Sequence, residues 1–417
     1  MDFTEEVKET IEKELGELQK FTCTPGKGVT RLPFSKEGKE TASYLKVKMQ
    51  EAGLNAWIDL VGNVRGILPA DCDDAKTILM GSHYDTVKNG GAYDGIAGVV
   101  CALEIVKLLK KSGIRRNYNL EIIAFNDEEG CMFGSGCLGS KSLTGQIDQH
   151  YIEHLVDENG ISIEEWMKSW GGNPHELEKQ KMDLNQVRAF FEIHIEQGPV
   201  LYEKKDDLGI VTGIVGLLRC MVTLEGRADH AGTTPMDMRQ DTINIASKVI
   251  SKLDVFAEEE NNGAVATCGF IRAYPNAMNV IASKTEFTMD IRSISDVSIE
   301  HMKAKIQELL EQYTKECGAS YNIDIKLRQP AVKMNQVFVK RLAKKCEDHG
   351  YNYSKMVSGA AHDAMVFADK VDTVMVFVPS INGRSHCPEE LSRPEDLAKA
   401  VQIVYETILE LMLEVAL

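Results

Sequence analysis

Short apolar runs alternate with helical patterns along most of the chain. Apolar runs that end in polar residues predict buried strands at 77–85, 119–129, 188–198 and 371–380. Apolar residues at helical spacing predict helices at 1–21, 95–113 and 395–416. This alternation is typical of an α/β fold with a mixed, mostly parallel sheet flanked by helices.

The pattern changes in the middle of the chain. Strands are predicted there at 215–228, 264–275, 284–293 and 320–328, with helices at 241–260 and 298–318. The order βαββαβ suits a small antiparallel sheet with helices on one face. We therefore expect a discontinuous first domain, 1–213 and 329–417, and an inserted α+β domain, 214–328. Residues 142–160 mix polar and apolar positions and are predicted to be irregular, covering one edge of a site.

The amino-acid composition excludes some classes of binding partner and indicates a cellular compartment. The 417 residues include 47 Lys and Arg against 63 Asp and Glu, a net charge of −16. This acidity argues against nucleic acid and against an anionic membrane surface. No signal-peptide pattern or membrane-spanning stretch is recognisable. The ten cysteines include no C-x-x-C pair, which favours reduced thiols and a cytoplasmic protein.

Four segments place possible metal ligands at or after predicted strand ends, where open α/β sheets bind their ligands. They contain His83, Asp85 and Asp94, the pair Glu128–Glu129, His194 with Gln197 nearby, and His386. Each residue alone is more simply read as a structural or solvated side chain. Together they supply the histidines and carboxylates of a two-metal hydrolytic centre. Residues i and i+2 of an extended chain share a face, so Asp85 could steady the His83 imidazole.

Several motifs then make a family resemblance specific. They are GSHYDTVKNGGAYDG, FNDEEG, FFEIHIEQGPVL, GRADHAGTTPMDMR, MDIRS, SGAAHDA and SHCPEE. In this order, over nearly the whole chain, they resemble the amidase/hydantoinase/carbamoylase branch of the dinuclear zinc-peptidase superfamily. HIEQGPVL and HAGTTPM distinguish this branch from ordinary aminopeptidases. The resemblance implies a zinc-aminopeptidase-like catalytic domain with an inserted ferredoxin-like dimerisation and lid domain.

The resemblance also implies a ligand set. His83, Asp94 and His194 would hold one metal, and Asp94, Glu129 and His386 the second, with Asp94 bridging. Zinc is the expected ion, and manganese, nickel or cobalt would suit the same ligands. Asp85 would orient His83. Glu128 would be the general base that takes a proton from a water bridging the metals, and the resulting hydroxide would attack a carbamoyl carbon.

Further residues of the resembled family surround the substrate. His230 would reach the site from the partner subunit of a homodimer and stabilise the developing oxyanion. Arg292 and Asn279 would bind the substrate carboxylate. The rest of the pocket would be Gln197, Ser358, Gly359 and Ala360. His362 and Asp363 are expected to be structural, and residues 130–140 carry Cys and small side chains where relatives often have Arg-Phe.

These inferences predict a metal-dependent amidohydrolase that cleaves the carbamoyl or ureido C–N bond of a small carboxylate. N-carbamoyl-L-amino acids, allantoate and β-ureido acids all remain open as substrates. A metallo-aminopeptidase or dipeptidase on the same scaffold is the enzymatic alternative. A catalytically silent metal-binding protein is the third reading, against which the intact Glu128 argues.

Overall fold

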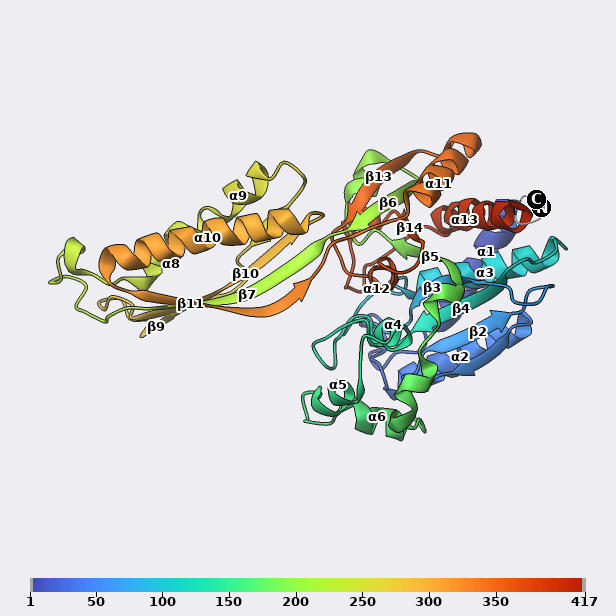
Figure 1. Cartoon of the computed structure of the whole chain (residues 1–417), viewed down its shortest axis with the longest axis horizontal. Helices are drawn as coiled ribbons and strands as arrows, with labels where there is room; N and C mark the ends of the chain where they lie inside the picture. Colours follow the sequence, from blue (N-terminus) through green and yellow to red (C-terminus); the bar gives the residue numbers. More distant parts are fainter. Residues whose placement is uncertain (1–2, 415–417) are drawn as a thin grey trace. The chain divides into compact units, whose positions relative to one another are not determined.

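The computed structural model describes residues 3–414, and the chain divides into two compact units. Unit 2 is Gly213–Lys333, and unit 1 contains the described residues on either side of it. Figure 1 colours both along the sequence. No helix within 3–414 is long and apolar enough to cross a membrane.

Unit 1 is built on a mixed sheet that has nine strands among the described residues; its short edge strand β12 and the last two residues of β6 fall within the bounds of unit 2. These are β1 (Asn55–Ile58), β2 (Val64–Leu68), β3 (Thr77–His83), β4 (Asn119–Phe125), β5 (Val187–Ile195), β6 (Leu208–Ile214), β12 (Val332–Lys333), β13 (Tyr353–Ser358) and β14 (Thr373–Val378). Their order is β1-β2-β4-β3-β5-β14-β6-β12, with β13 beside β6. The central strands β4, β3, β5 and β14 are parallel, and antiparallel pairs extend both edges. The predicted α/β class is confirmed.

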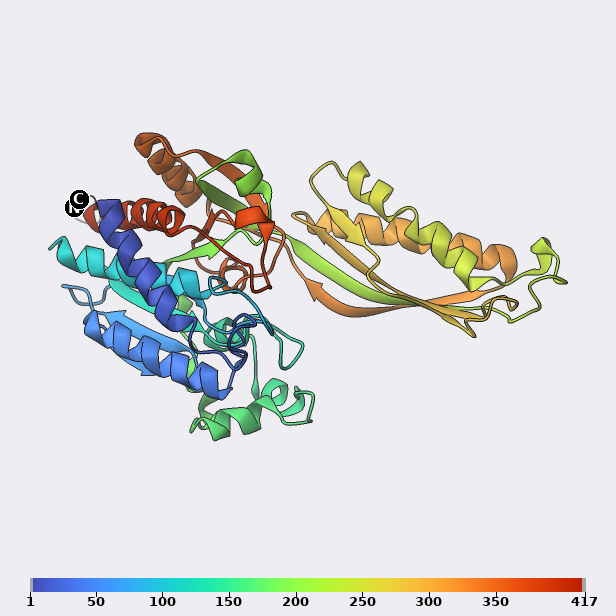
Figure 2. The ribbon, with the colours of Figure 1, turned by 180° about the vertical axis from the view of Figure 1, so that it is seen from behind.

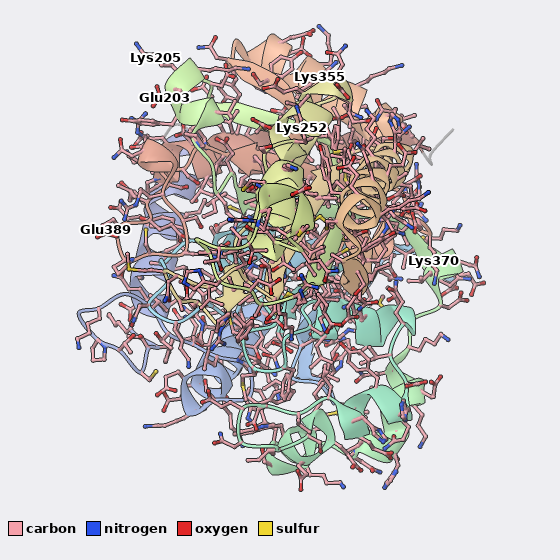
Figure 3. The ribbon with its side chains drawn as sticks, turned by 90° about the vertical axis from the view of Figure 1, so that its left-hand side faces the viewer. Glu203, Lys205, Lys252, Lys355, Lys370 and Glu389 are labelled. Atoms are coloured by element: carbon pink, nitrogen blue, oxygen red, sulfur yellow. The ribbon has the colours of Figure 1, made fainter. Side chains whose placement is uncertain are left out.

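Helices cover this sheet. They are α1 (Phe3–Leu18), α2 (Lys36–Glu51), α3 (Ile96–Lys111), α4 (Leu138–Thr144), α5 (Gln149–His154), α6 (Ile163–Ser169), α7 (Val200–Lys204), α11 (Gln336–His349), α12 (Asp363–Phe367) and α13 (Pro394–Glu414). Helices α1, α3 and α13 pack together, as Figure 2 shows from behind. Residues 1–2 and 415–416 of the two predicted terminal helices lie outside the described residues. Charged side chains such as Lys205, Lys370 and Glu389 point outward (Figure 3).

Helix α3 lies close against β5 because Gly98 has no side chain. A Cβ atom at this position would lie 2.1 Å from the carbonyl oxygen of Ile193. Every residue of the first two turns of α3 is buried, from Ile96 onward. The close packing places the start of this helix beside the end of β5, where His194 lies.

The prediction that 142–160 is irregular was wrong in part: 145–148 and 155–160 lie outside the helices, but 142–144 and 149–154 are helical. Helix α4 extends to Thr144, and α5 begins after Asp148, whose side chain accepts a hydrogen bond from the backbone N–H of Tyr151. Ile147 and Ile152 are buried in a cluster with Leu138. The mixture of polar and apolar residues is therefore the amphipathic pattern of short helices on a small core of their own.

Unit 2 is an antiparallel sheet with helices on one face (Figure 1). Its elements are β7 (Gly216–Glu225), α8 (Thr242–Ile250), α9 (Leu253–Glu259), β8 (Val265–Thr267), β9 (Ile271–Tyr274), β10 (Lys284–Ser293), α10 (Asp296–Cys317) and β11 (Ser320–Gln329). The strand order is β11-β7-β10-β8, and β9 also pairs with β10. Alternate residues of β7 and β10 pack against α8 and α10. The predicted helix 241–260 divides at Ser251–Lys252, and the predicted strand 264–275 divides around Gly269.

Candidate metal centre

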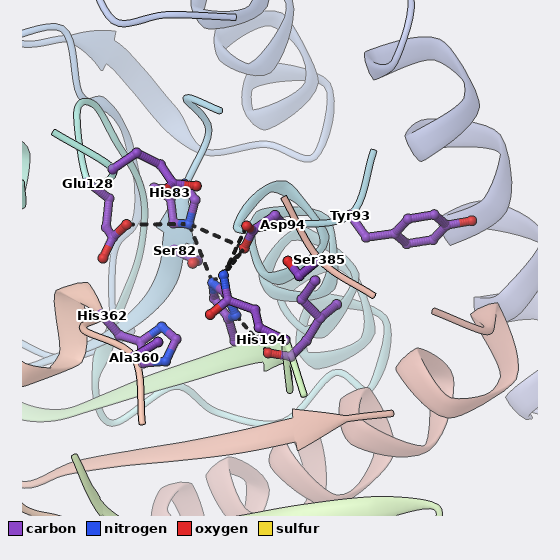
Figure 4. Close-up of polar contacts among 12 residues, drawn as sticks. Ser82, His83, Tyr93, Asp94, Glu128, His194, Ala360, His362 and Ser385 are labelled. Atoms are coloured by element: carbon purple, nitrogen blue, oxygen red, sulfur yellow. Dashed lines mark hydrogen bonds and ion pairs between the residues drawn. The ribbon is translucent and has the colours of Figure 1, made fainter. Parts of the chain in front are cut away.

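Two histidines meet at the carboxyl ends of neighbouring parallel strands. His83 ends β3 and His194 lies near the end of β5, and each side chain is about 1% exposed. Asp94, in the loop before α3, is also buried. Figure 4 shows these three side chains around one centre, with Tyr93 pointing away from it.

Both imidazoles are fixed through Nδ1. His83 Nδ1 lies 3.1 Å from the backbone oxygen of Asp85, and His194 Nδ1 lies 2.9 Å from that of Ile195. A carbonyl oxygen can only accept, so Nδ1 carries the hydrogen and Nε2 presents a lone pair. Burial lowers the pKa of His83, which keeps this imidazole neutral. The two Nε2 atoms face each other at 3.4 Å.

The spacing of the first group fits a bound cation. His194 Nε2 lies 3.4 Å and His83 Nε2 3.8 Å from Asp94 Oδ1. Ligand atoms about 2.0–2.2 Å from a tetrahedral ion lie roughly 3.3–3.6 Å from one another. Two facing lone pairs repel each other unless a cation or a proton lies between them. The residues His83, Asp94 and His194 therefore suit a divalent metal.

A second group shares Asp94. His386 Nε2 lies 3.1 Å from Asp94 Oδ2 and 3.3 Å from Glu129 Oε1. The buried Glu129 Oε1 accepts no hydrogen bond within 3–414, which is unusual for a buried carboxylate oxygen. The contacts with Asp94 and then with Glu129 raise the pKa of His386 to about 10. This pocket thus attracts positive charge, which a metal ion would supply in place of the proton.

Glu128 adjoins both groups. Its Oε2 lies 3.9 Å from His83 Nε2, and the thiol of Cys137 lies 3.8 Å from its Oε1. Burial raises the pKa of the Glu128 carboxyl well above its usual value, and the neighbouring Glu129 carboxylate acts in the same direction. A carboxylate with raised basicity beside a cation site is suited to accept and return a proton.

The contact between Asp85 and His83 differs from the expected one. The backbone oxygen of Asp85, not its carboxylate, lies in hydrogen-bonding distance of His83. The carboxylate, 3.7 Å from Nδ1, accepts the backbone N–H groups of Glu128 and Glu129 at 3.0 and 3.3 Å. Asp85 thus connects the His83 strand to the loop that carries the glutamate pair.

Gln197 and the turn 358–360 lie around the same centre. Gln197 Nε2 donates to both oxygens of Asp94 at 3.1 and 3.0 Å. The Ser358 hydroxyl contacts the backbone N–H and oxygen of Ala360 and lies 2.9 Å from His362 Nε2. The His362 ring packs edge-on against His194, with a centroid distance of 4.5 Å (Figure 4). Gly359 completes this turn.

Two buried glutamates of the site were missed by the sequence analysis. Glu390 accepts the backbone N–H groups of Tyr93 and Asp94 through Oε1, and the Ser385 hydroxyl and His386 N–H through Oε2. Glu192 accepts the Ser82 hydroxyl at 2.7 Å and the N–H of Ala364 at 2.9 Å. The available signals were the final acid of the SHCPEE motif, for Glu390, and an acid inside an apolar strand, for Glu192.

Three predicted site residues lie in unit 2. His230 bridges to Val280, and the N–H of Ala231 donates to Asn279. His230 Nδ1 accepts the N–H groups of Gly232 and Thr233, so its Nε2 carries the hydrogen and can donate. Arg292 lies toward the other end of β10, paired with Asp290 at 2.8 Å. Within unit 2, Arg292 is therefore not brought together with His230 and Asn279.

Two adjoining groups of histidine and carboxylate ligands on an α/β sheet define a metal-dependent hydrolase. Residues 79–410 match the model of the peptidase family M20/M25/M40. The chain belongs to this family, whose members here include hydrolases of amide C–N bonds.

The resemblance to the hydantoinase/carbamoylase branch is confirmed by relatives over the full length. The chain is 36% identical over 396 residues to the N-carbamoyl-L-amino-acid amidohydrolase of Paenarthrobacter aurescens, covering 95% of this chain and 96% of the relative. It is likewise 36% identical over 396 residues to the allantoate amidohydrolase of Escherichia coli, with the same coverage. A solved amidase of the hydantoinase/carbamoylase family from Burkholderia multivorans superposes with a TM-score of 0.87 at 29% identity, covering 97% of both chains.

Proposed function

We propose that the chain hydrolyses the carbamoyl or ureido C–N bond of a small carboxylate and releases ammonia and carbon dioxide. N-carbamoyl-L-amino acids and allantoate are the leading substrates, in keeping with the relatives at 36% identity. The observation that carries the proposal is the shared Asp94, which joins two possible ligand groups beside Glu128.

Two divalent ions per subunit would be held by these groups, zinc first, with manganese, nickel or cobalt as alternatives. His83, Asp94 and His194 would hold one, and Asp94, Glu129 and His386 the other. When bound, such ions polarise a carbonyl oxygen and acidify water. The Glu128 carboxylate would take the proton of the attacking water and pass it to the leaving nitrogen.

Residues outside the ligand groups would bind the substrate. Gln197 and the turn Ser358–Ala360 border the centre and would orient the ureido group. His230, whose Nε2 donates to no described residue, would stabilise the oxyanion. Arg292 and Asn279 would bind the carboxylate. Because these two residues lie apart within unit 2, they would reach it from different subunits of a dimer.

We further propose a homodimer formed through unit 2, acting as a dimerisation and lid domain, with His230 contributed in trans. All ten cysteines are free, which supports a cytoplasmic location.

The test is a substrate panel. Metal-reconstituted protein is incubated with several N-carbamoyl-L-amino acids, their D-enantiomers, allantoate, a β-ureido acid and dipeptides, and ammonia and amine release are followed. We expect ammonia release from at least one ureido carboxylate, with no cleavage of dipeptides. Activity on dipeptides alone would replace the proposal with a metallo-dipeptidase.

A further inference from the structure

Unit 1 contains a cavity that none of the candidate metal ligands lines. Its volume is about 610 Å³, within the range of small-molecule sites. Parts of α2, β1 and β2 form one side, and residues 170–182, including the 3₁₀ helix Pro174–Gln180, form the other. We call it the indole cavity, after Trp57 and Trp170 in its wall.

The two indoles are held in place by their neighbours. Trp170 donates from Nε1 to the backbone oxygen of Phe34 at 2.8 Å, and its ring packs edge-on against the Phe34 ring. The Arg65 guanidinium lies 4.9 Å from the centre of the Trp57 ring and is itself paired with Glu121. Both tryptophans are half-buried, so each keeps part of its surface toward the cavity. Fixed aromatic walls of this kind suit a flat ligand.

The charge of the lining is positive although the chain is strongly acidic. Four cationic side chains and two acidic ones line the cavity: Lys39, Arg65, Lys179, Lys181, Asp59 and Glu176. Glu176 pairs with Lys179. The Asp59 carboxylate accepts hydrogen bonds from the backbone N–H groups of Val61 and Asn63 and from the Asn63 side-chain amide. Lys39 and Lys181 are exposed and form no ion pair within residues 3–414. The Lys181 ammonium lies over Gly145, outside the lining, and would swing on its flexible side chain to meet an anion in the cavity.

One buried donor in the lining also lacks a partner. Gln180 accepts the N–H of Leu60 through Oε1 at 3.1 Å. Its Nε2 is buried and makes no hydrogen bond to any described residue. Buried amide donors are nearly always paired. This one is closed to solvent as well, so it would meet a ligand acceptor after the Gln180 side chain turns toward the cavity.

We propose that the indole cavity is a second ligand site, which binds a small planar anion. Its aromatic ring would pack on Trp57 and Trp170, its phosphate or carboxylate would be met by Lys39 and Lys181, and an acceptor atom would face Gln180 Nε2. The inference does not depend on the proposed catalytic function.

The cavity wall is connected to the metal centre by hydrogen bonds. The Asn63 side-chain oxygen, in the turn that Asp59 holds, accepts the N–H of Asn126 at 3.0 Å, and the Asn126 amide donates to Val61 at 2.8 Å. Asn126 is two residues before Glu128. A ligand in the cavity would thus rest against the turn that supports the glutamate pair.

Tryptophan fluorescence reports directly on the proposal, because two of the three tryptophans line the cavity. AMP and 2-naphthoate serve as phosphate and carboxylate probes, with adenosine and ribose 5-phosphate as probes that lack the charge or the ring. We expect saturable quenching by AMP, 2-naphthoate or both, and at least about tenfold weaker binding of the two incomplete probes. The stronger of the two complete probes identifies the anion. No saturable binding of either one at millimolar concentration overturns the proposal.

Variants locate the binding site. Calorimetric affinity for the stronger probe should fall about tenfold or more in the K39Q/K181Q double variant, whose exposed side chains leave the fold intact. Trp166→Phe is the matched control, because Trp166 donates to Asp157 and does not line the cavity. It should keep both affinity and quenching. Unchanged affinity in K39Q/K181Q would place the probe elsewhere and refute the indole cavity as its site.

Discussion

At the scale of single residues, the candidate metal centre depends on which atom of each histidine and carboxylate side chain is free of hydrogen bonds to the backbone and can bind a metal. Carbonyl oxygens occupy Nδ1 of His83 and His194, so both Nε2 atoms turn toward Asp94. Glu128 is beside this arrangement, with one oxygen near His83 and the other near Cys137. A side chain in this position could accept and return a proton, as we propose, or it could bind a metal together with His83 and Glu129.

Glu128→Gln tests which of these roles the residue has. Turnover of the best ureido substrate should fall by about 10²–10⁴-fold, because the amide cannot accept the proton. Metal content, measured by atomic emission, should stay at the wild-type value. Glu104→Gln, a buried glutamate of α3 paired with Lys107, is the control and should keep full turnover. Full activity of Glu128→Gln with its metals bound would exclude Glu128 as the base.

Glu390 has a different task, since its two oxygens connect the loops of Asp94 and His386. In Glu390→Gln the amide NH₂ would face two N–H or O–H donors, and one of the loops would be released. We expect metal affinity to weaken about 10–100-fold, as for other residues that support metal ligands. Glu389→Gln, an exposed neighbour paired with Arg384, should leave the affinity unchanged in the same competition titration. Equal affinities for the two variants would contradict this role.

At the scale of elements, the strands that carry the site were predictable and the short helices were not. The predicted strands 77–85, 119–129 and 188–198 correspond to β3, β4 and β5, because buried parallel strands are continuous apolar runs. Their carboxyl ends share one sheet edge, which is why residues so far apart in sequence could be grouped. Helices α4 and α5 have seven and six residues, fewer than two turns, so no helical period could be established there.

Hydrogen bonds between side chains and backbone groups could not be predicted from the sequence either. Glu390 is nearly three hundred residues from Tyr93 and Asp94, whose N–H groups it accepts, and no residue type marks a backbone donor. The same holds for the Asp85 carboxylate, which could be expected near His83 from the i, i+2 rule but binds the 128–129 backbone instead.

The contact of α3 with β5 gives a prediction at this scale. Gly98→Ala places a Cβ atom against the Ile193 carbonyl, a backbone atom that cannot rotate away. The helix must shift, and the free energy of unfolding in urea should fall by about 1–3 kcal/mol. Gly16→Ala in α1 is the matched control, because no atom lies within 4 Å of its Cβ position. It should raise stability by up to about 1 kcal/mol. If Gly98→Ala leaves the free energy of unfolding unchanged, α3 and β5 are less tightly packed than the structure shows.

At the scale of the whole molecule, bound metals should stabilise the fold. The two ligand groups and the adjoining Glu128 bring the carboxylates of Asp94, Glu128 and Glu129 together in one buried place, where like charges repel each other without a cation. An ion at about 100 times its dissociation constant adds roughly 2.7 kcal/mol per site. Chelation should therefore lower the melting temperature in calorimetry, and added zinc or manganese should restore it. His386→Ala should show a smaller chelator effect than wild type. A melting temperature that does not respond to chelation would argue against resident metals.

The proposed homodimer predicts that two variants, each inactive alone, restore activity when their chains form a mixed dimer. If His230 acts in the partner's site, a dimer of one His230→Ala chain and one Glu128→Gln chain has one site with both residues intact and one with neither. Each parent should be nearly inactive. After subunit exchange, random mixing gives half heterodimers, so about a quarter of wild-type activity should return. Two different affinity tags and native mass spectrometry verify that heterodimers form. Mixing His230→Ala with wild-type chains serves as the exchange control. If heterodimers are present and activity does not return, His230 does not act in trans.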